Sequence, residues 1–335
     1  MSDNDRVRMK DVAALAGVGT MTVSRVLRTP DAVSQRTRQR VEAAIRATGF
    51  VANSAAASLR SGSMPMVAVI VPTLRTSIVV DTLDGLQSVL SAANHQMLVG
   101  CSNYDLPTEE QLVRDALRWR PAGIVLCGLT HTNETLNMIR TRGIPLAEVW
   151  SITDAPRDIV VGISNIDASF EMAQSLVKWG YRRICYAHIS RHDNERAQQR
   201  FDGYRLALQA SGIIVEPDMH RVTENTYQAG ARIVTEFRSR YKDLDAVFFG
   251  SDVLAVGALM ECHRRGWKVP EEIAIAGYDN LDIAAATAPP LTTVSTQLFE
   301  VGKRGAELLL DRIYGKLDRP VAIGLQGLIL RRGSA

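Results

Sequence analysis

The sequence predicts a small, basic, all-α head followed by an α/β body built on parallel sheets. Three observations support this fold class. The chain has 335 residues, which is too long for one ordinary hydrophobic core and indicates two or three. Residues 10–49 show helical patterns with no strand-like run. From Met66 onward, nearly continuous apolar runs alternate with helix-length segments.

The composition is that of a globular protein, with 46% hydrophobic and 22% charged residues. No apolar run approaches the roughly 20 residues that span a bilayer, and the start, MSDNDRVRMK, lacks the apolar stretch of a secretory signal. We therefore expect a cytoplasmic protein without a membrane partner. The four cysteines form no CxxC and no Cys/His pair at metal-ligand spacing, which predicts buried reduced thiols.

The charge is distributed unevenly. Residues 1–62 carry ten Lys/Arg and five Asp/Glu, a net charge of +5, whereas the rest of the chain carries 29 and 31, a net charge of −2. A basic head on a nearly neutral body suggests that the head meets a polyanion.

The head is predicted to contain three helices. The first two cover residues 10–16 and 20–27. The third begins after Ser34, a good N-cap, and ends at Gly49, a typical C-terminal glycine.

The spacing between the first two helices carries the functional prediction. Ala13 lies four residues before Gly17, and Val23 lies six residues after it. A small residue where helices cross, a glycine at the turn and a branched residue that locks the second helix are typical of a helix-turn-helix. A three-helix bundle with no DNA-binding role is the alternative.

The residues in this head closely resemble the lactose-repressor (LacI) family. The resemblance covers residues 11–18 (DVAALAGV) and 22–27 (TVSRVL), and it continues without a gap through Asn53. It implies a transcription regulator that binds a pseudo-palindromic operator on double-stranded DNA as a homodimer.

The resemblance also assigns DNA-binding roles. Thr20, Met21 and Arg25 would contact base edges, and an arginine fork can bond guanine bidentately. Packing inside the head is the alternative role for Met21. Other residues would bind phosphates, while Gly19 stands where relatives often have a serine cap, which puts one such contact in doubt. The predicted set in the head is Met9, Thr20, Met21, Thr22, Ser24, Arg25, Arg28, Ser34 and Thr37, followed by Asn53.

Residues 53–60 (NSAAASLR) are alanine-rich and are followed by Ser-Gly-Ser. A helix this short is marginal alone. The resemblance implies a hinge helix that forms on DNA, with Ala56 and its neighbours permitting close approach to the twin helix. Leu59 would be the apolar wedge in the minor groove. A solvated tether that never folds is the alternative.

The body is predicted to contain parallel strands covered by helices on both faces. Ligands of such sheets bind beyond the carboxyl ends of the strands, where this chain has many polar residues. The predicted strands are residues 67–71, 97–101, 123–127, 146–150, 160–164, 184–188, 246–250 and 273–277.

The body resembles the same family, and with it the periplasmic sugar-binding fold. Residues 200–204 (RFDGY) match an effector-binding arginine motif, and residues 277–279 (GYD) and 289–294 (PPLTTV) match a C-terminal signature. This implies two lobes with an effector between them, and chain crossings near Gly162, Leu291 and Arg319. The predicted organisation is a head at 1–52, a hinge and linker at 53–65, and an effector-binding and dimerisation domain at 66–331, with an N-lobe at about 66–162 and 292–319 and a C-lobe at about 163–291 and 320–331.

The effector site is assigned from the same resemblance. Arg200 would clamp ligand oxygens, and Asp279 would accept from ligand hydroxyls. Ser251 stands where the family usually has an amide, and Asn225 replaces an aromatic residue, which argues against a flat purine.

Glu148 is unusual, because a carboxylate in an apolar run is costly unless it is paired. The run at 145–150 (PLAEVW) resembles the gluconate-utilisation repressor branch of the family, which implies a sugar acid as effector. An arginine could bind its carboxylate, although Arg75 and Arg196 could instead be solvated rim charges. The predicted effector set is Arg75, Glu148, Trp150, Arg196, Arg200, Asn225, Ser251 and Asp279.

Other functions lack their motifs. The chain has no Gly-x-Ser-x-Gly, Walker loop or zinc motif, and Pro72 to Arg75 stand where a dinucleotide-binding enzyme needs a glycine loop. We therefore predict no enzyme activity, cofactor or metal. No leucine heptads follow Leu330, so we expect a dimer made by the body rather than a tetramer. Because regulators of sugar-acid use are usually released from DNA by their substrate, the resemblance also implies induction rather than co-repression. A neutral hexose is the alternative effector.

Overall fold

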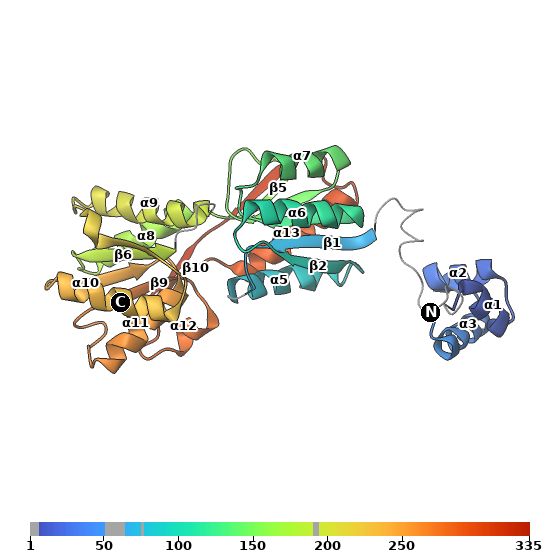
Figure 1. Ribbon diagram of the computed structural model, residues 1–335, viewed down its shortest axis with the longest axis horizontal. Helices are drawn as coiled ribbons and strands as arrows, with labels where there is room; N and C mark the ends of the chain where they lie inside the picture. The colour runs from blue at the N-terminus through green and yellow to red at the C-terminus, as the bar shows by residue number, and fades with distance from the viewer. Residues whose placement is uncertain (1–6, 51–63, 75–76, 190–193) are drawn as a thin grey trace. The chain divides into compact units, whose positions relative to one another are not determined.

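The computed structural model describes residues 7–50, 64–74, 77–189 and 194–335. The chain divides into two compact units, Met1–Met64 and Pro65–Ala335 (Figure 1). The first is all helical and the second is α/β, so the predicted fold class is confirmed.

The head contains the three predicted helices, α1 (Met9–Ala16), α2 (Thr20–Arg28) and α3 (Gln35–Thr48), with a short 3-10 turn, η1 (Pro30–Ala32), before α3. Gly17 adopts a φ of 61° at the turn between α1 and α2, which favours glycine. The Ser34 hydroxyl oxygen accepts from the Thr37 N–H at 3.4 Å, so Ser34 is the N-cap of α3. One small core closes the head: Val12, Ala13, Ala16, Val23, Val26, Val41 and Ala44.

The first sheet of the body has the strand order β11-β5-β4-β3-β1-β2. Strand β5 pairs in parallel with β11 and β4, β4 with β3, and β1 with β2. Strand β1, which lies between β3 and the edge strand β2, is covered by helices on both faces. Val67, Val69 and Val71 pack with α5 and α13, and Ala68 and Ile70 pack with α6 and α7. The elements of this N-lobe are β1 (Met64–Val71), α5 (Ser77–Leu90), β2 (Gln96–Cys101), α6 (Leu106–Arg118), β3 (Pro121–Cys127), α7 (Asn133–Arg142), β4 (Leu146–Trp150), β5 (Ile159–Ile163), α13 (Leu298–Ile313) and β11 (Val321–Leu325).

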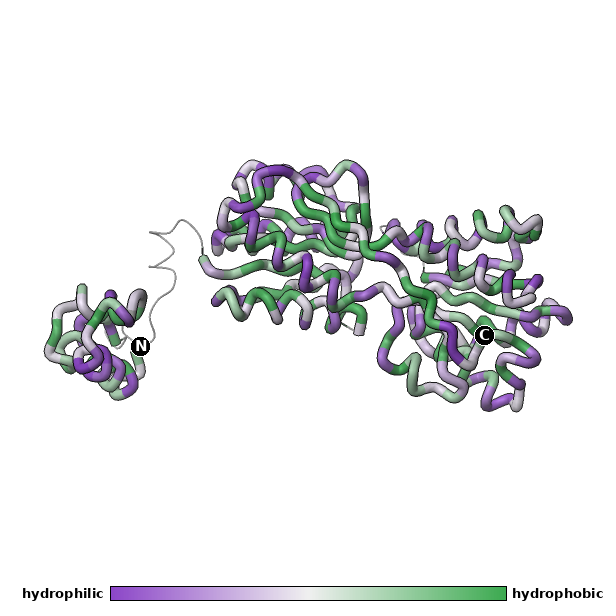
Figure 2. The backbone as a smooth tube through the Cα atoms, turned by 180° about the vertical axis from the view of Figure 1, so that it is seen from behind, coloured by the Kyte–Doolittle hydropathy of each residue, from purple (hydrophilic) through white to green (hydrophobic). Residues whose placement is uncertain are grey.

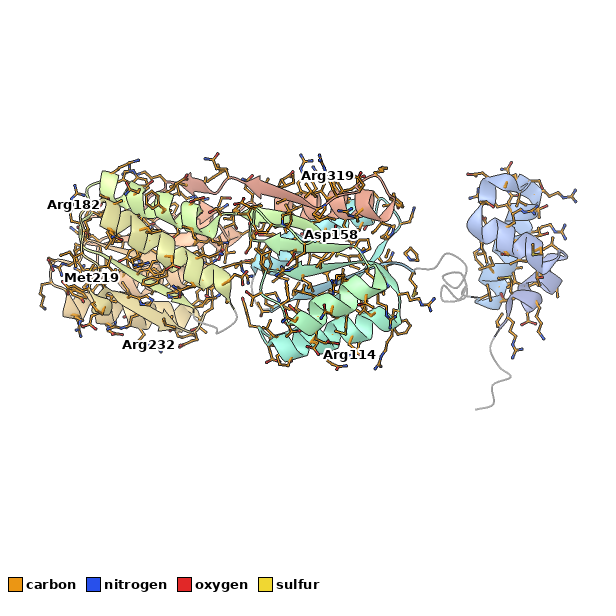
Figure 3. All side chains as sticks on the ribbon, turned by 90° about the horizontal axis from the view of Figure 1, so that it is seen from above. Arg114, Asp158, Arg182, Met219, Arg232 and Arg319 are labelled. Atoms are coloured by element: carbon orange, nitrogen blue, oxygen red, sulfur yellow. The ribbon has the colours of Figure 1, made fainter. Side chains whose placement is uncertain are left out.

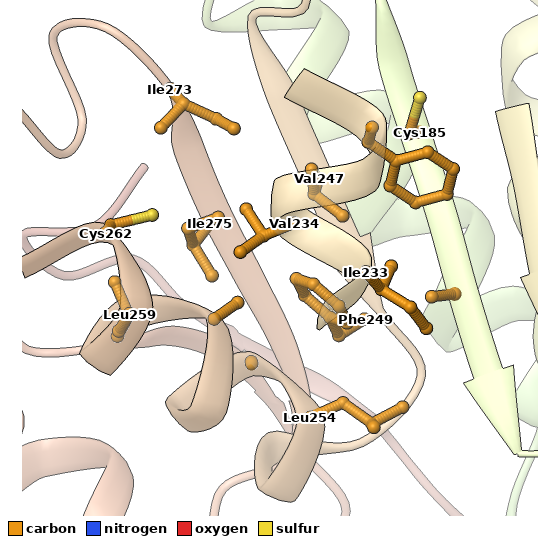
Figure 4. Close-up of a cluster of buried hydrophobic side chains, with 14 of the residues drawn as sticks. Cys185, Ile233, Val234, Val247, Phe249, Leu254, Leu259, Cys262, Ile273 and Ile275 are labelled. Atoms are coloured by element: carbon orange, nitrogen blue, oxygen red, sulfur yellow. The ribbon is translucent and has the colours of Figure 1, made fainter. Parts of the chain in front are cut away.

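The second sheet has the strand order β12-β10-β9-β8-β6-β7. Strand β12 pairs antiparallel with β10, and the other neighbouring strands pair in parallel. Helices α8 and α9 cover one face, while α10 and α11 cover the other, where Ile233, Phe249 and Leu254 pack together (Figure 4). The elements of this C-lobe are α8 (Asn165–Lys178), β6 (Ile184–Ile189), α9 (Glu195–Ala210), η2 (Pro217–Met219), β7 (His220–Thr223), α10 (Tyr227–Arg240), β8 (Ala246–Phe249), α11 (Asp252–Arg264), β9 (Ala274–Asp279), α12 (Asp282–Ala286), β10 (Thr292–Ser295) and β12 (Leu328–Leu330).

The chain crosses between the lobes three times (Figure 1). The first crossing, at Ser164, lies close to the predicted Gly162. The other two lie later than predicted, at residues 296–297 and 326–327, because β10 belongs to the C-lobe sheet and β11 to the N-lobe sheet. The predicted boundaries near Leu291 and Arg319 therefore assigned β10 to the N-lobe and β11 to the C-lobe, the reverse of their positions in the two sheets.

The hydropathy of the chain follows this layering. Apolar strands form the interior of each lobe (Figure 2), and charged side chains such as Arg114, Arg182 and Arg232 lie on the outside of the body (Figure 3). None of the helices in the described ranges is long and apolar enough to span a membrane.

Candidate functional site

The start of α2 presents an exposed surface. Val23 and Val26 bury the inner side of the helix, whereas Thr20, Met21 and Arg25 are exposed, Met21 by 72%. Packing inside the head therefore does not account for Met21. The three side chains predicted to contact base edges share the solvent-facing side of one helix.

Two other arginines of the head form contacts within it. Arg38 pairs with Glu42 at 2.8 Å, and Arg40 donates to the Ala16 carbonyl at 2.5 Å, at the end of α1. Arg25 has no acidic partner among the described residues, so its guanidinium is available to an external acceptor.

The predicted phosphate contacts are less uniform. Ser34 is exposed, and Thr22 and Thr37 are half-buried. Ser24 is only 8% exposed, which leaves little of its hydroxyl for DNA, and the partly buried Met9 packs against the core of the head. The side chain of Arg28 and the residues Asn53, Ala56 and Leu59 lie outside the described part of the chain.

In the body, the carboxyl ends of the strands meet at a partly open cavity between the lobes. Its N-lobe wall includes Tyr104 and Trp150, and its C-lobe wall contains most of the polar side chains. Six predicted effector residues line it: Trp150, Arg196, Arg200, Asn225, Ser251 and Asp279.

Arg200 is fixed in this cavity from several sides. It comes from α9 and is 7% exposed. Its Nη1 donates to Asn165 Oδ1 at 3.3 Å, and its guanidinium carbon lies 4.8 Å from the centre of the Tyr278 ring. Its buried Nε has no hydrogen-bond partner. Because an unpaired buried donor is costly, this Nε is placed to bind a ligand oxygen.

Arg196 forms a second cationic wall. It is 7% exposed, its guanidinium carbon lies 5.2 Å from the centre of the Trp150 ring, and its Nη1 lies 3.3 Å from Glu195 Oε1. This burial excludes the interpretation of Arg196 as a solvated rim charge.

Asp279 is the carboxylate of the cavity, at the end of β9. Burial raises its pKa to about 7, against the opposing effect of Arg200 and Arg196. Two guanidinium groups therefore face one carboxyl group that is easily protonated. Glu195 pairs with Arg196 from outside the cavity lining, so the charge balance favours an anion chiefly at Arg200 and at the cavity-facing side of Arg196.

The remaining predicted residues contribute differently. The buried Asn225 Oδ1 has no partner, so it can accept from a ligand hydroxyl. The Ser251 oxygen accepts from the Val253 N–H at 3.3 Å and serves as the N-cap of α11.

Backbone strain is concentrated at the cavity edge. Trp150 has a φ of 80° and Asp279 a φ of 111°, values that non-glycine residues rarely adopt. Each such residue costs on the order of 1–3 kcal/mol and is commonly found at ligand sites.

Glu148 does not line this cavity. It is fully buried two residues before the end of β4, where its Oε1 accepts from Arg157 Nη1 at 2.6 Å and lies 3.5 Å from His131 Nε2. Burial lowers the pKa of His131, but hydrogen bonds and charge from Glu109 and Glu148 outweigh burial and raise it to about 9. Glu148 is thus paired through Oε1 in an ion network, while its buried Oε2 has no hydrogen-bond partner among the described residues. Arg75 lies outside the described residues.

Several cavity residues were absent from the predicted set. Asn165 accepts from both Arg200 and the Tyr278 hydroxyl, and so links two walls of the site. Tyr104 follows β2, where the carboxyl-end rule could have found it. The other members are Ile78, Val79, Ile163, Ile189, Asn194, Tyr278, Thr296, Leu298 and Val301.

A helix-turn-helix head and a two-lobed body with a cavity lined by buried arginines define a ligand-regulated DNA-binding protein. The profile of "Bacterial regulatory proteins, lacI family" matches residues 8–53, and that of "Periplasmic binding protein-like domain" matches residues 173–334. The HTH-type transcriptional regulator GntR of Escherichia coli K12 is 34% identical over 98% of both chains.

Solved structures of similar proteins agree with this class of protein. A LacI-family transcriptional regulator from Silicibacter pomeroyi matches with a TM-score of 0.90 and 32% identity over 98% of this chain and 99% of its own. A transcriptional regulator CelR–cellobiose complex matches with a TM-score of 0.72 and 30% identity over 98% of this chain and 100% of its own. The chain belongs to the lacI family of bacterial regulatory proteins, and it is a DNA-binding transcription regulator, not an enzyme.

Proposed function

We propose that this regulator represses genes for the use of a sugar acid of the gluconate type, and that binding of the acid releases it from its operator. The observation that carries the proposal is that two buried arginines, Arg196 and Arg200, line the same cavity as Asp279, whose carboxyl group is the one carboxyl in the described lining. A polyhydroxy acid offers a carboxylate for the guanidinium groups and hydroxyls for Asp279 and Asn225.

The unpartnered polar atoms support the same ligand class. Arg200 Nε needs an acceptor, and Asn225 Oδ1 needs a donor. An acid with several hydroxyls satisfies both, whereas a purely apolar ligand leaves both unpaired. Similarity to GntR points to the same class.

A ligand screen tests the proposal. Full-length protein is heated with D-gluconate, related sugar acids, their phosphates and neutral hexoses. A ligand at a hundred times its Kd stabilises the body by about 2.7 kcal/mol. Stabilisation by neutral sugars alone would contradict an acid effector.

A neutral sugar is the second candidate. A relative with 30% identity was solved with cellobiose, and the Trp150 ring on the cavity wall could stack on a sugar face. This candidate leaves the second guanidinium group without a ligand charge, so it ranks below the acid.

The proposal includes a homodimer formed by the body. Val80 on α5 is 51% exposed, and Leu98 and Val99 on the edge strand β2 are 43% and 37% exposed. Exposed apolar groups of this kind are typical of an interface. We expect sedimentation to give a dimer at micromolar concentration and Leu98→Asp to shift it toward monomer. A wild-type monomer would count against the dimer.

The link between effector and operator remains the predicted hinge at residues 53–60. In this proposal, Leu59 enters the minor groove and the lobes control whether the paired hinges form. Leu59→Ala should weaken operator binding and leave the affinity of the free protein for gluconate unchanged. An unchanged operator Kd would remove Leu59 from the interface.

A further inference from the structure

Glu195, at the start of α9 in the C-lobe, binds the N-lobe at three points. Its Oε1 accepts from the Leu129 N–H at 3.0 Å and from the Ser151 hydroxyl at 3.2 Å, and its Oε2 accepts from the Thr130 hydroxyl at 3.1 Å. Leu129 and Thr130 follow β3, and Ser151 follows β4. One carboxylate of the C-lobe therefore fastens two loops of the N-lobe.

The same carboxylate holds an arginine of the cavity. Arg196 Nη1 lies 3.3 Å from Glu195 Oε1, while the guanidinium group covers the Trp150 ring. A guanidinium group has five N–H donors in a planar fork. The ion pair with Glu195 fixes one side of the fork, and the cavity-facing side can bind a ligand anion.

The N-lobe is shaped to receive this pair. Gly128, between β3 and Leu129, has a φ of 91°. A Cβ atom at this position would lie 2.2 Å from Arg196 Nη1 and 2.7 Å from Glu195 Oε1. Only glycine gives the side chains of Glu195 and Arg196 this close approach to the backbone.

The electrostatics favour a charged Glu195. Burial alone would raise its pKa, but the Arg196 charge and the Leu129 N–H outweigh burial and hold the pKa below its usual value. An ionised carboxylate makes hydrogen bonds roughly twice as strong as a neutral group. The three contacts with the N-lobe are therefore charge-assisted.

We propose that Glu195 is a positioning residue of the effector site, which aims Arg196 into the cavity and clasps the two lobes. An anion bound to Arg196 completes a continuous series of contacts from the ligand, through Arg196 and Glu195, to the N-lobe loops. Ligand binding thereby stabilises the clasped arrangement. The part of this inference that concerns anion binding by Arg196 rests on the proposed function.

Hydrogen exchange tests the clasp directly, because the Leu129 N–H donates to Glu195. Full-length wild type is compared with Glu195→Gln, Glu195→Ala and a control, Glu236→Gln, whose residue pairs with Arg221 in the same lobe, outside the cavity lining. In ligand-free protein, exchange of segment 128–131 should accelerate roughly tenfold in Glu195→Ala, less in Glu195→Gln, and not in the control.

Calorimetry tests the positioning role with D-gluconate and its neutral amide as probes. Glu195→Ala should raise the Kd of gluconate roughly 10- to 100-fold and reduce the preference for gluconate over the amide. Glu195→Gln keeps the shape of the side chain and should fall between Ala and wild type.

The two readouts separate the proposals. Unchanged exchange of segment 128–131 in ligand-free Glu195→Ala would overturn the clasp, whether or not gluconate binds. Equal loss of affinity for gluconate and its amide would overturn the positioning of Arg196. Failure of wild type to bind any acid would contradict the proposed function, while the exchange result would still decide whether the clasp exists.

Discussion

The head and the body use arginine in opposite ways. Arg25 is exposed and has no acidic partner among the described residues, whereas Arg200 is 7% exposed and is held by Asn165 and Tyr278. DNA offers a large external surface, so an exposed side chain can adjust to it. A small ligand has few contacts, so its site must be preorganised and dry. Recognition in the head is therefore local, and recognition in the body depends on tertiary contacts.

The largest expected effect comes from removing the buried arginine. Arg200→Ala removes the positive charge that most lowers the pKa of Asp279, and it removes the unpaired Nε donor. We expect a loss of about 2–5 kcal/mol in gluconate binding, which abolishes the response to effector. Calorimetry and an operator-binding assay with and without gluconate measure both effects.

Arg205→Ala is the matched control, since Arg205 lies on the same helix but is exposed, 3.9 Å from Asp202. The operator Kd without gluconate should be unchanged in both variants. If Arg200→Ala still responds at wild-type gluconate concentrations, the cavity is not the effector site.

In the head, Arg25→Ala should weaken operator binding by about 1–3 kcal/mol and relax discrimination at one base pair of each half-site. Arg46→Ala, in the last turn of α3, serves as a control of equal charge. Binding to operator and to random DNA is measured by fluorescence anisotropy. An equal loss on both would make Arg25 a phosphate contact.

The raised pKa of Asp279 predicts a pH dependence in the body. The ordinary pKa of aspartate, 3.8, rises to about 7 in the fold, so the protonated carboxyl stabilises the folded state at low pH. This stabilisation is complete below about pH 4 and disappears as the pH rises through 7. An anionic ligand should also bind more tightly at pH 6 than at pH 8, by at most about tenfold.

Asp279→Asn should remove both dependences, as seen by calorimetry and denaturant unfolding across this range. A pH dependence that persists in Asp279→Asn would assign it to another group.

Local patterns predicted most of the fold because they reflect local physics. The caps Ser34 and Gly49 and the apolar run of β4 lie where they were expected. Four strands were not predicted. Edge strand β7 (HRVT) and β10 (TTVS) are too polar for the apolar-run criterion, while β11 and β12 flank the third crossing, where only tertiary pairing distinguishes strand from linker.

The effector cavity was predictable only in part. The carboxyl-end rule found Trp150 and Asp279, because both end strands. Glu148 was placed in the site because its partner was unknown: Arg157 lies nine residues away in the chain, in the loop between β4 and β5. No sequence pattern marked Glu195 as a functional residue, since the three hydrogen bonds that it accepts depend on how the two lobes meet.

The smallest expected effect concerns Ser34, where two substitutions distinguish a role in helix stability from a role in DNA binding. Its oxygen caps α3 and is exposed, so it can serve the fold, the DNA or both. Ser34→Ala should destabilise the head by about 1 kcal/mol. Ser34→Asp keeps a good N-cap but places a negative charge where a phosphate contact is predicted, so it should preserve stability and weaken operator binding. Thermal unfolding and anisotropy at two salt concentrations measure both. If Ser34→Asp binds the operator like wild type, Ser34 does not face a phosphate and acts only as a cap.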